Sequence, residues 1–122
     1  MISSMFIMLL RIVLERFSRG GSAMDNYDEF AYMVLAIVSE IPRGKILTYG
    51  TLAKKAGYPK NSRLVGKVLS SASLYGNYPC HRVVNVTGRL VPSWPEQRKL
   101  LEDEGITFKQ SGHVDVKKHL WD

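Results

Sequence analysis

Residues 48–69, TYGTLAKKAGYPKNSRLVGKVL, contain two short helix patterns joined by a tight turn, and this stretch decides the fold. Thr48 can act as the N-cap of a first helix over residues 49–56, because its hydroxyl can accept a backbone hydrogen bond. Gly57 follows and is the residue type that most often ends a helix. Two short helices with a glycine-containing turn have the dimensions of a helix-turn-helix. The second helix has its cap at Asn61 or Ser62 and one apolar face at Leu64, Val65, Val68 and Leu69.

The second helix pattern carries basic residues away from its apolar face, at Lys60, Arg63 and Lys67. Lysine and arginine on such a helix commonly contact DNA phosphates. The whole chain agrees in sign, since 17 Lys and Arg against 11 Asp and Glu give a formal net charge of +6. A basic balance favours anionic partners such as nucleic acid. The sequence therefore predicts DNA binding, and a basic protein without a nucleic-acid partner is the alternative.

The length of 122 residues fits one compact domain, and 45% hydrophobic with 23% charged residues is typical of a globular chain. The apolar run at residues 5–10 is followed by charges from Arg11 onward and is too short to span a membrane. We interpret residues 1–23 as an accessory extension or a mis-assigned start, or else as an amphipathic helix that packs on the domain or on a partner. The working domain is then residues 24–122, which keeps a charge of +4 after the loss of three Arg and one Glu. No membrane association is expected.

Helix and strand patterns flank the helix-turn-helix. Apolar residues at helical spacing predict a first helix over residues 25–41. Residues 82–86 have the composition of a strand, Gly88 stands in a turn, and residues 89–91 read as a short return strand. A hairpin behind a helix-turn-helix has the arrangement of a wing. The predicted fold is therefore a small α/β winged-helix domain.

The C-terminal part of the chain predicts one more helix and a second hairpin. Pro95 suits the first turn of a helix that runs through Glu104, and Leu100 and Leu101 are expected to dock this helix on the core. Two short segments, residues 106–108 and 114–116, are expected to pair, and Leu120 and Trp121 to pack the tail onto the core.

The only cysteine stands in the stretch YPCHRVV, residues 78–84. A thiol becomes a good nucleophile only as the thiolate, so its pKa must fall or a base must take its proton. His81 is the nearest base, but adjacent side chains on a strand point to opposite faces, so a direct contact needs a turn or a bridging water. Pro79 favours such a break from strand geometry. The alternative is that Cys80 is an ordinary buried small residue.

A base of this kind works best when a third group orients its imidazole, and a carboxylate is the usual choice. Glu102, Asp103 and Glu104 all lie near the end of the downstream helix, and their spacing does not distinguish among them. Metal binding is not expected, because one Cys and three scattered His show no ligand spacing.

Four elements together resemble the O6-alkylguanine-DNA alkyltransferases. The stretch Pro79-Cys80-His81-Arg82-Val83 resembles the active-site signature Pro-Cys-His-Arg-Val of that family. Three further elements follow the order of the family: Thr48-Tyr49 resembles its Ser/Thr-Tyr, Ser62-Arg63-Leu64-Val65-Gly66 its Ala-Arg-x-Val-Gly, and Leu100-Leu101 with Glu104-Gly105 its Leu-Leu-x-x-Glu-Gly.

The resemblance implies a role for each matching residue. Cys80 would accept the alkyl group, His81 would act through water as its base, and Glu104 would orient His81. Tyr49 would lie near the target nucleotide, where it would help to rotate the phosphate or donate a proton to the departing guanine. Arg63 would enter the duplex in place of the flipped base, from the minor groove. Each molecule would act once, without a cofactor or a metal. The remaining assignments are DNA contacts for Thr48, Lys60, Gly66, Lys67 and Arg82, and an alkyl pocket at Pro79, Val91, Ser93 and Trp94.

The chain also departs from the repair enzymes. The usual Asn-Pro upstream of the active-site motif is absent from residues 71–74, the loop that walls the pocket is the shorter segment 91–95, and there is no room for the N-terminal domain of many full-length members. These departures resemble the alkyltransferase-like proteins, which bind and flip O6-alkylguanine, transfer nothing and recruit nucleotide excision repair. Those proteins usually carry Trp or Ala in place of Cys80. Further likeness lies in Asn85-x-x-Gly88-Arg89, Glu96-Gln97-Arg98 and Lys118-His119-Leu120-Trp121.

Three functions follow as hypotheses. We favour irreversible transfer of an alkyl group from O6-alkylguanine to Cys80, because a sensor has no need of the cysteine. The second is a non-catalytic lesion sensor that recruits nucleotide excision repair proteins, and the third is a plain winged-helix module with a structural cysteine. The expected partner is double-stranded DNA containing O6-alkylguanine. We expect a monomer in the cytoplasm, associated with the nucleoid when it is bound to DNA.

Overall fold

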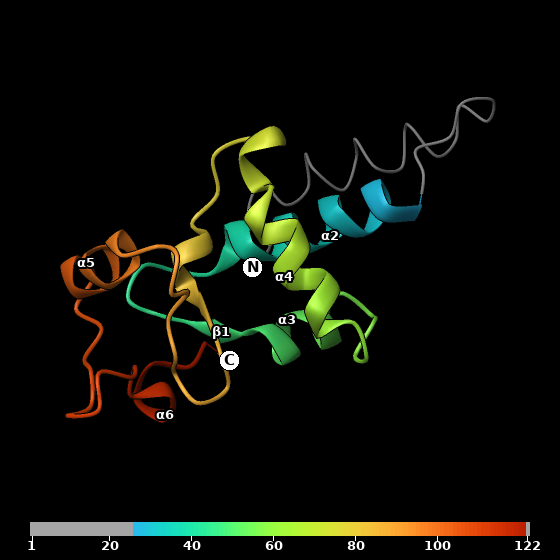
Figure 1. Ribbon diagram of the computed structural model, residues 1–122. Helices are drawn as coiled ribbons and strands as arrows, with labels where there is room; N and C mark the ends of the chain where they lie inside the picture. The colour runs from blue at the N-terminus through green and yellow to red at the C-terminus, as the bar shows by residue number, and fades with distance from the viewer. Residues whose placement is uncertain (1–25, 122) are drawn as a thin grey trace.

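The computed structural model describes residues 26–121 (Figure 1). The predicted extension at residues 1–23 and its boundary with the domain lie outside the described residues. Within the described part, no helix is both long and apolar enough to cross a membrane. The elements are α2 (Asn26–Glu40), β1 (Leu47–Thr48), α3 (Tyr49–Lys55), α4 (Ser62–Ser70), η1 (Ala72–Leu74), η2 (Cys80–Arg82), β2 (Val83–Val84), α5 (Glu96–Asp103) and α6 (Val116–His119).

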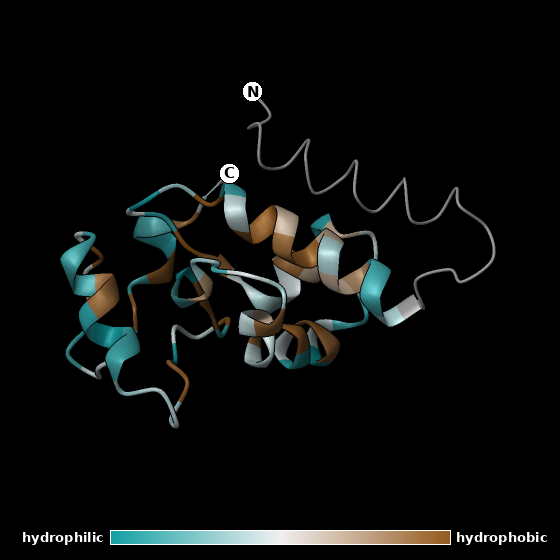
Figure 2. Cartoon of the chain, turned by 90° about the horizontal axis from the view of Figure 1, so that it is seen from above, coloured by the Kyte–Doolittle hydropathy of each residue, from teal (hydrophilic) through white to brown (hydrophobic). Residues whose placement is uncertain are grey.

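The helix-turn-helix prediction is confirmed by α3 and α4, which pack on each other and on α2 (Figure 1). Thr48 caps α3, and its hydroxyl accepts a hydrogen bond of 3.2 Å from the Thr51 N–H. Gly57 follows with φ +89°, a conformation that favours glycine. Asn61 stands at the N-cap of α4, although its side chain makes no capping hydrogen bond. Figure 2 shows apolar and polar bands alternating along α2, whose apolar face forms the centre of the core.

The predicted strand over residues 82–86 is reduced to Val83–Val84, which pairs in parallel with Leu47–Thr48. The return strand expected at residues 89–91 is not a regular strand, so that part of the prediction was wrong. The hairpin is present as a turn, closed by a bond of 2.8 Å from the Gly88 N–H to the Asn85 carbonyl. The first arm pairs with β1 because both of its valines are then fully buried.

The two-strand sheet separates two apolar clusters. Leu47 and Val83 are paired in register and face the cluster built by α2, α3 and α4. Val84 faces the opposite cluster, because successive side chains on a strand alternate sides. That second cluster consists of Ile46, Val84, Leu101, Ile106 and Val114. The segment that carries Cys80 therefore enters the fold at the boundary between the two clusters.

The downstream helix and the terminal hairpin form as expected, with one correction. Leu101 is fully buried in α5, but Leu100 is 39% exposed and does not dock the helix. The side chain of Gln97, one turn earlier, takes the inward position instead and is fully buried. Phe108 and Val114 pair as an antiparallel bridge, which confirms the second hairpin.

Candidate functional site

Cys80 lies on a tight turn and not on a strand. The turn is the 3-10 segment Cys80–Arg82, in which the Arg82 N–H donates to the Pro79 carbonyl at 3.1 Å. Pro79 precedes it with φ −78° and ψ 59°, which breaks the strand. The Cys80 and His81 side chains therefore need not point to opposite faces, as they would on a strand.

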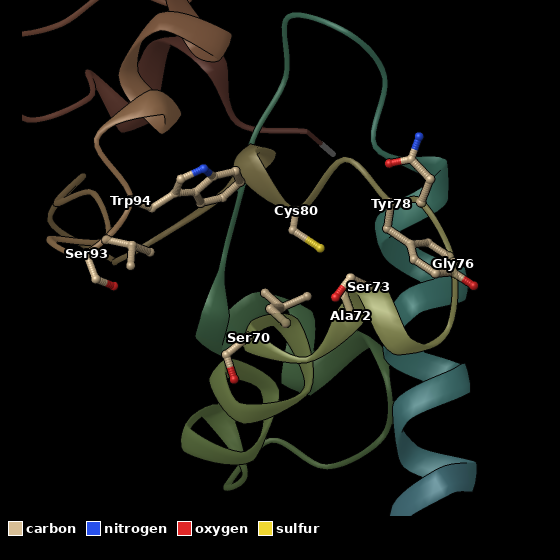
Figure 3. Close-up of a pocket in the computed structure, with 11 residues that line it drawn as sticks. Ser70, Ala72, Ser73, Gly76, Tyr78, Cys80, Ser93 and Trp94 are labelled. Atoms are coloured by element: carbon tan, nitrogen blue, oxygen red, sulfur yellow. The ribbon is translucent and has the colours of Figure 1, made fainter.

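The Cys80 thiol opens into a cavity of about 380 Å³ between α4, the segment after it and the loop before α5 (Figure 3). Three of the four residues predicted for an alkyl pocket, Val91, Ser93 and Trp94, line this cavity, whereas Pro79 is not among the residues that line it. The lining residues that sequence reasoning missed are Leu69, Ser70, Ala72, Ser73, Gly76, Asn77 and Tyr78.

These missed residues come from segment 69–78, which the sequence shows only as a polar loop that leads to the cysteine. The single available signal was Tyr78, two positions before Cys80 in the active-site motif. The chain after α4 folds back to line the same cavity as the cysteine. A local sequence pattern does not predict such a tertiary contact.

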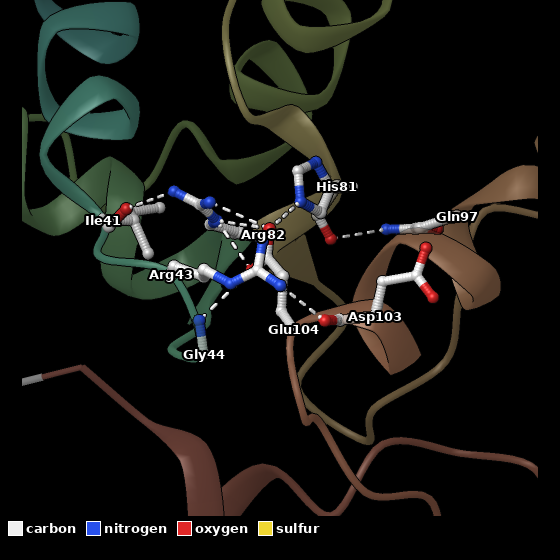
Figure 4. A network of polar contacts seen from close by, with 8 residues as sticks. All are labelled: Ile41, Arg43, Gly44, His81, Arg82, Gln97, Asp103 and Glu104. Atoms are coloured by element: carbon white, nitrogen blue, oxygen red, sulfur yellow. Dashed lines mark hydrogen bonds and ion pairs between the residues drawn. The ribbon is translucent and has the colours of Figure 1, made fainter.

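His81 and Glu104 meet directly, with 2.6 Å between His81 Nε2 and Glu104 Oε2 (Figure 4). Arg82 donates to the same carboxylate, and the Gly44 N–H donates to its Oε1 at 3.2 Å. Glu102 and Asp103 instead form ion pairs with Arg98 and Lys99 on the surface of α5. These pairs measure 3.4 Å for Arg98 Nε to Glu102 Oε2 and 3.3 Å for Lys99 Nζ to Asp103 Oδ1.

The environment gives the thiol and the carboxyl opposite pKa shifts. Burial raises the pKa of Cys80 from 9.0 to about 11, so the thiol keeps its proton at neutral pH. Burial acts in the same direction on Glu104, but hydrogen bonds from Arg82, His81 and the Gly44 N–H outweigh it and lower its pKa from 4.5 to about 2. At neutral pH the carboxylate that contacts His81 is therefore ionised, whereas the thiol of the preceding residue keeps its proton.

Tyr49 and Thr48 lie at the start of α3, near the same turn. Burial raises the pKa of Tyr49, and the charge of an ionised Cys80 raises it further. The Tyr49 ring lines a second hollow of about 240 Å³, and Val91 lines both this hollow and the cavity at Cys80. Thr48 is buried and occupied as the helix cap, with its hydroxyl also 3.0 Å from that of Thr51.

The basic residues of the helix-turn-helix are exposed, as the sequence predicts. Arg63, Lys60 and Lys67 all face solvent on or before α4, and Lys67 also lies 5.3 Å from the Tyr27 ring centroid. At Gly66 an added Cβ would meet no atom within 4 Å, so the backbone there is open to close approach. The last turn of α4 lines the cavity, so the helix that carries Arg63 ends at the cysteine.

All the residues that line the cavity at Cys80 come from a segment of the chain, residues 41–95, that is basic and free of acids. Residues 41–95 hold nine Lys and Arg and no Asp or Glu. Of these cations, Arg82 pairs with a carboxylate, that of Glu104, and its side chain is only 16% exposed. In the structure the Arg82 guanidinium is bound to Glu104 and to the Ile41 carbonyl. Its contact with DNA stays a prediction. A basic segment that also supplies an uncharged cavity lining suits a polyanion whose uncharged part enters the cavity.

Comparison with known proteins agrees with this geometry. The family model of the 6-O-methylguanine DNA methyltransferase, DNA binding domain, matches residues 29–106. The DNA base-flipping protein of Escherichia coli (strain K12) is 39% identical over 101 residues, which cover 80% of this chain and 78% of that protein. The alkyltransferase-like protein 1 of Schizosaccharomyces pombe is 37% identical over 98 residues, covering 76% of this chain and 91% of that protein.

A solved structure extends the likeness to three dimensions. The crystal structure of S. pombe Atl1 in complex with damaged DNA containing O6-carboxymethylguanine matches with a TM-score of 0.70 at 31% identity, covering 78% of this chain and 96% of that one. The family resemblance and the helix-turn-helix fold class predicted from the sequence are thereby confirmed. The chain belongs to the 6-O-methylguanine DNA methyltransferase family, through the DNA-binding domain of that family.

Proposed function

We propose that this protein binds O6-alkylguanine in double-stranded DNA, receives the flipped nucleotide in the cavity at Cys80 and transfers the alkyl group to the Cys80 sulfur. The observation that carries the proposal is the position of the single thiol of the chain, which opens into a cavity at the end of the helix-turn-helix. DNA-repair relatives and a neighbouring structure bound to damaged DNA support the choice of partner.

Recognition requires the base to leave the duplex, because stacking hides the O6 atom. Extruding a nucleotide costs a few kcal/mol, and contacts made in the flipped state must offset this cost. Arg63 is an exposed cation on α4, whose last turn reaches the cavity, and it is the residue that we assign to the space left by the base. The acid-free segment at residues 41–95 supplies the attraction for the phosphates.

The transfer step forms a carbon–sulfur bond and breaks the bond between the alkyl carbon and O6. The thiol proton passes through water to His81, whose imidazole is held at 2.6 Å by Glu104. The departing guanine takes a proton from the Tyr49 hydroxyl, and the proton on His81 restores that hydroxyl. The net change is a thioether on Cys80 and an unmodified guanine, with the thiol proton now on guanine. Since water does not hydrolyse a thioether, each molecule reacts once.

Two observations favour a second candidate function, a lesion sensor that transfers nothing. The pKa of Cys80 is raised to about 11, so the resting thiol is a weak nucleophile. The relatives with high coverage bear the names base-flipping protein and alkyltransferase-like protein. In this case the protein would mark the lesion for nucleotide excision repair proteins, acting as a monomer on DNA in the cytoplasm.

The deciding experiment mixes purified protein with a duplex that holds one O6-methylguanine and records the intact protein mass. Gain of one methylene, localised to Cys80 and absent in Cys80→Ala, establishes the transferase. No gain, together with tighter binding to the lesion than to guanine, rejects transfer and supports the sensor. Equal affinity for the two duplexes rejects both functions and leaves a plain DNA-binding module.

A further inference from the structure

Gln97 is a fully buried polar side chain in the first turn of α5, and neither proposed function assigns it a role. Its Oε1 accepts a hydrogen bond of 2.8 Å from the Val91 N–H. Its Nε2 donates to the carbonyls of His81 and Val83, at 3.2 Å and 3.3 Å. Figure 4 shows the amide directed toward the His81 carbonyl. One side chain thus holds three backbone groups from two separate segments.

These bonds join two walls of the cavity at Cys80. On one side, Val91 and Trp94 line the cavity, and their loop is closed by bonds from the Trp94 N–H to the Val91 carbonyl and from the Gln97 N–H to the Trp94 carbonyl, at 3.0 Å and 3.1 Å. On the other side, the amide holds the carbonyl of His81, the residue after Cys80. The distance between the thiol and the Val91–Trp94 wall is therefore set through Gln97.

Packing alone does not account for an amide at this position. Leu101, one turn further along α5, docks the helix with an apolar side chain that is also fully buried. Burying an amide is unfavourable unless its polar atoms find partners, and both ends of this amide do. A glutamine at a position that a leucine could fill indicates that this position requires the three hydrogen bonds and not only a buried side chain.

We infer that Gln97 is a positioning residue that fixes the width of the cavity and so selects the size of the O6-alkyl group. This inference rests on the proposed recognition of O6-alkylguanine. With the amide in place, the wall at Val91 and Trp94 is held on the same cavity as Cys80, where we expect it to contact a small group. Without it, the wall is free to move away, and a methyl group loses its contacts while a bulky group keeps them.

The test compares Gln97→Met, which keeps the volume and removes all three bonds, with the parent protein. Both carry Cys80→Ser, so that transfer does not consume the lesion. Affinity is measured for duplexes with O6-methylguanine, O6-benzylguanine and guanine. We expect Gln97→Met to weaken binding of the methyl lesion about tenfold and binding of the benzyl lesion much less, because buried hydrogen bonds of the wall are lost. Equal losses for both lesions would overturn the inference.

Two controls separate this role from stability and from folding failure. Ile106→Val trims the core cluster that holds Leu101 without touching the amide, so it should lower the melting temperature and leave the methyl-to-benzyl ratio unchanged; a ratio shift in Ile106→Val would overturn the inference. In the wild type, the Val91 amide proton should exchange slowly by NMR, and rapid exchange would overturn it even if Gln97→Met fails to fold. Equal binding of all three duplexes by the parent rejects both the proposed function and the size selection. Slow exchange of the Val91 amide proton would in that case still support the hydrogen bond between Val91 and Gln97.

Discussion

Arg82 holds both carboxylate oxygens of Glu104, with 2.9 Å from Nε to Oε1 and 2.8 Å from Nη2 to Oε2. Its remaining nitrogen, Nη1, donates to the Ile41 carbonyl at 2.7 Å (Figure 4). Arg82 thereby fastens the Cys80 turn to the end of α5 and to the segment after α2. The carboxylate that meets His81 is fixed in place by the neighbour of His81 itself, and its exposure is only 6%.

The first prediction concerns the pH dependence of stability through Glu104. Its pKa is lowered from 4.5 to about 2, so the unfolded chain takes up this proton at a higher pH than the folded chain. The stabilisation is complete above about pH 4.5 and is lost as the pH falls through 2. Glu104→Gln should therefore lower the free energy of unfolding by about 3 kcal/mol at pH 7. Urea unfolding of both proteins between pH 7 and pH 2 should show this difference shrinking toward zero.

Glu102→Gln is the matched control, because Glu102 lies on the same helix in an exposed pair with Arg98 at 3.4 Å. Such a pair contributes about 0–1 kcal/mol, so this variant should unfold nearly like the wild type. A difference for Glu104→Gln that stays constant down to pH 2 would contradict a lowered pKa for this carboxyl.

The second prediction concerns the ionisation of Cys80, the only thiol of the chain. Since its pKa is raised to about 11, its rate of reaction with iodoacetamide should keep rising with pH from 7 to 10 without a plateau. At pH 7 the folded protein should react about a hundredfold more slowly than the same protein unfolded in urea, where the thiol is solvated. A plateau below pH 9 would show a resting thiolate, and His81 would then not be needed as a base.

The helix-turn-helix could be predicted from the sequence because its signals are local. The cap at Thr48, the stop at Gly57 and the apolar face of α4 all act within a few residues of one another. The pairing of Val83–Val84 with Leu47–Thr48 could not be predicted, because burial between two distant clusters decides it and the sequence shows only a hairpin nearby. The residues of the candidate site divide in the same way, into those with a local pattern and those that the tertiary fold brings together.

Within the site, the sequence names the residues that belong to a motif but not those that tertiary packing brings to the cavity. The spacing of Glu102, Asp103 and Glu104 left the partner of His81 open, and only the resemblance named Glu104, which lies 2.6 Å from His81 in the structure. Gln97 entered the sequence analysis only through the likeness of Glu96-Gln97-Arg98 to the alkyltransferase-like proteins. Its burial gave no signal, because a glutamine on an otherwise polar helix is expected at the surface. Its burial depends on how α5 lies against the cysteine turn.

The third prediction separates lesion recognition from general charge. Arg63→Ala should weaken binding to an O6-methylguanine duplex by about tenfold or more, because it removes the side chain that we place in the duplex, and should leave the melting temperature unchanged. Lys99→Ala removes the same charge from the exposed side of α5 and should change lesion affinity little. Fluorescence anisotropy with lesion and guanine duplexes gives both values. Equal effects of the two substitutions would remove Arg63 from the flipping role.

The fourth prediction concerns salt. Residues 41–95 carry nine cations, eight of which lie outside the ion pair between Arg82 and Glu104, and no acid. Phosphate contacts by such a surface release counterions, so the logarithm of the association constant should fall linearly and steeply with the logarithm of salt concentration. The slope should be similar for lesion and guanine duplexes, because the phosphates are the same in both. A flat dependence would argue against a phosphate-contacting surface.

The fifth prediction tests the turn at residues 85–88, which lies against the terminal hairpin. Gly88 has φ +86°, and a Cβ added there would stand 2.3 Å from the Val114 carbonyl oxygen. Gly57 has nearly the same conformation, φ +89°, but an added Cβ would meet nothing within 4 Å. Gly57→Ala should therefore lose only the cost of positive φ, about 1 kcal/mol, whereas Gly88→Ala should lose about 3 kcal/mol or more because the backbone of Val114 must move. Urea unfolding measures both, and equal losses would show that the turn does not pack on Val114.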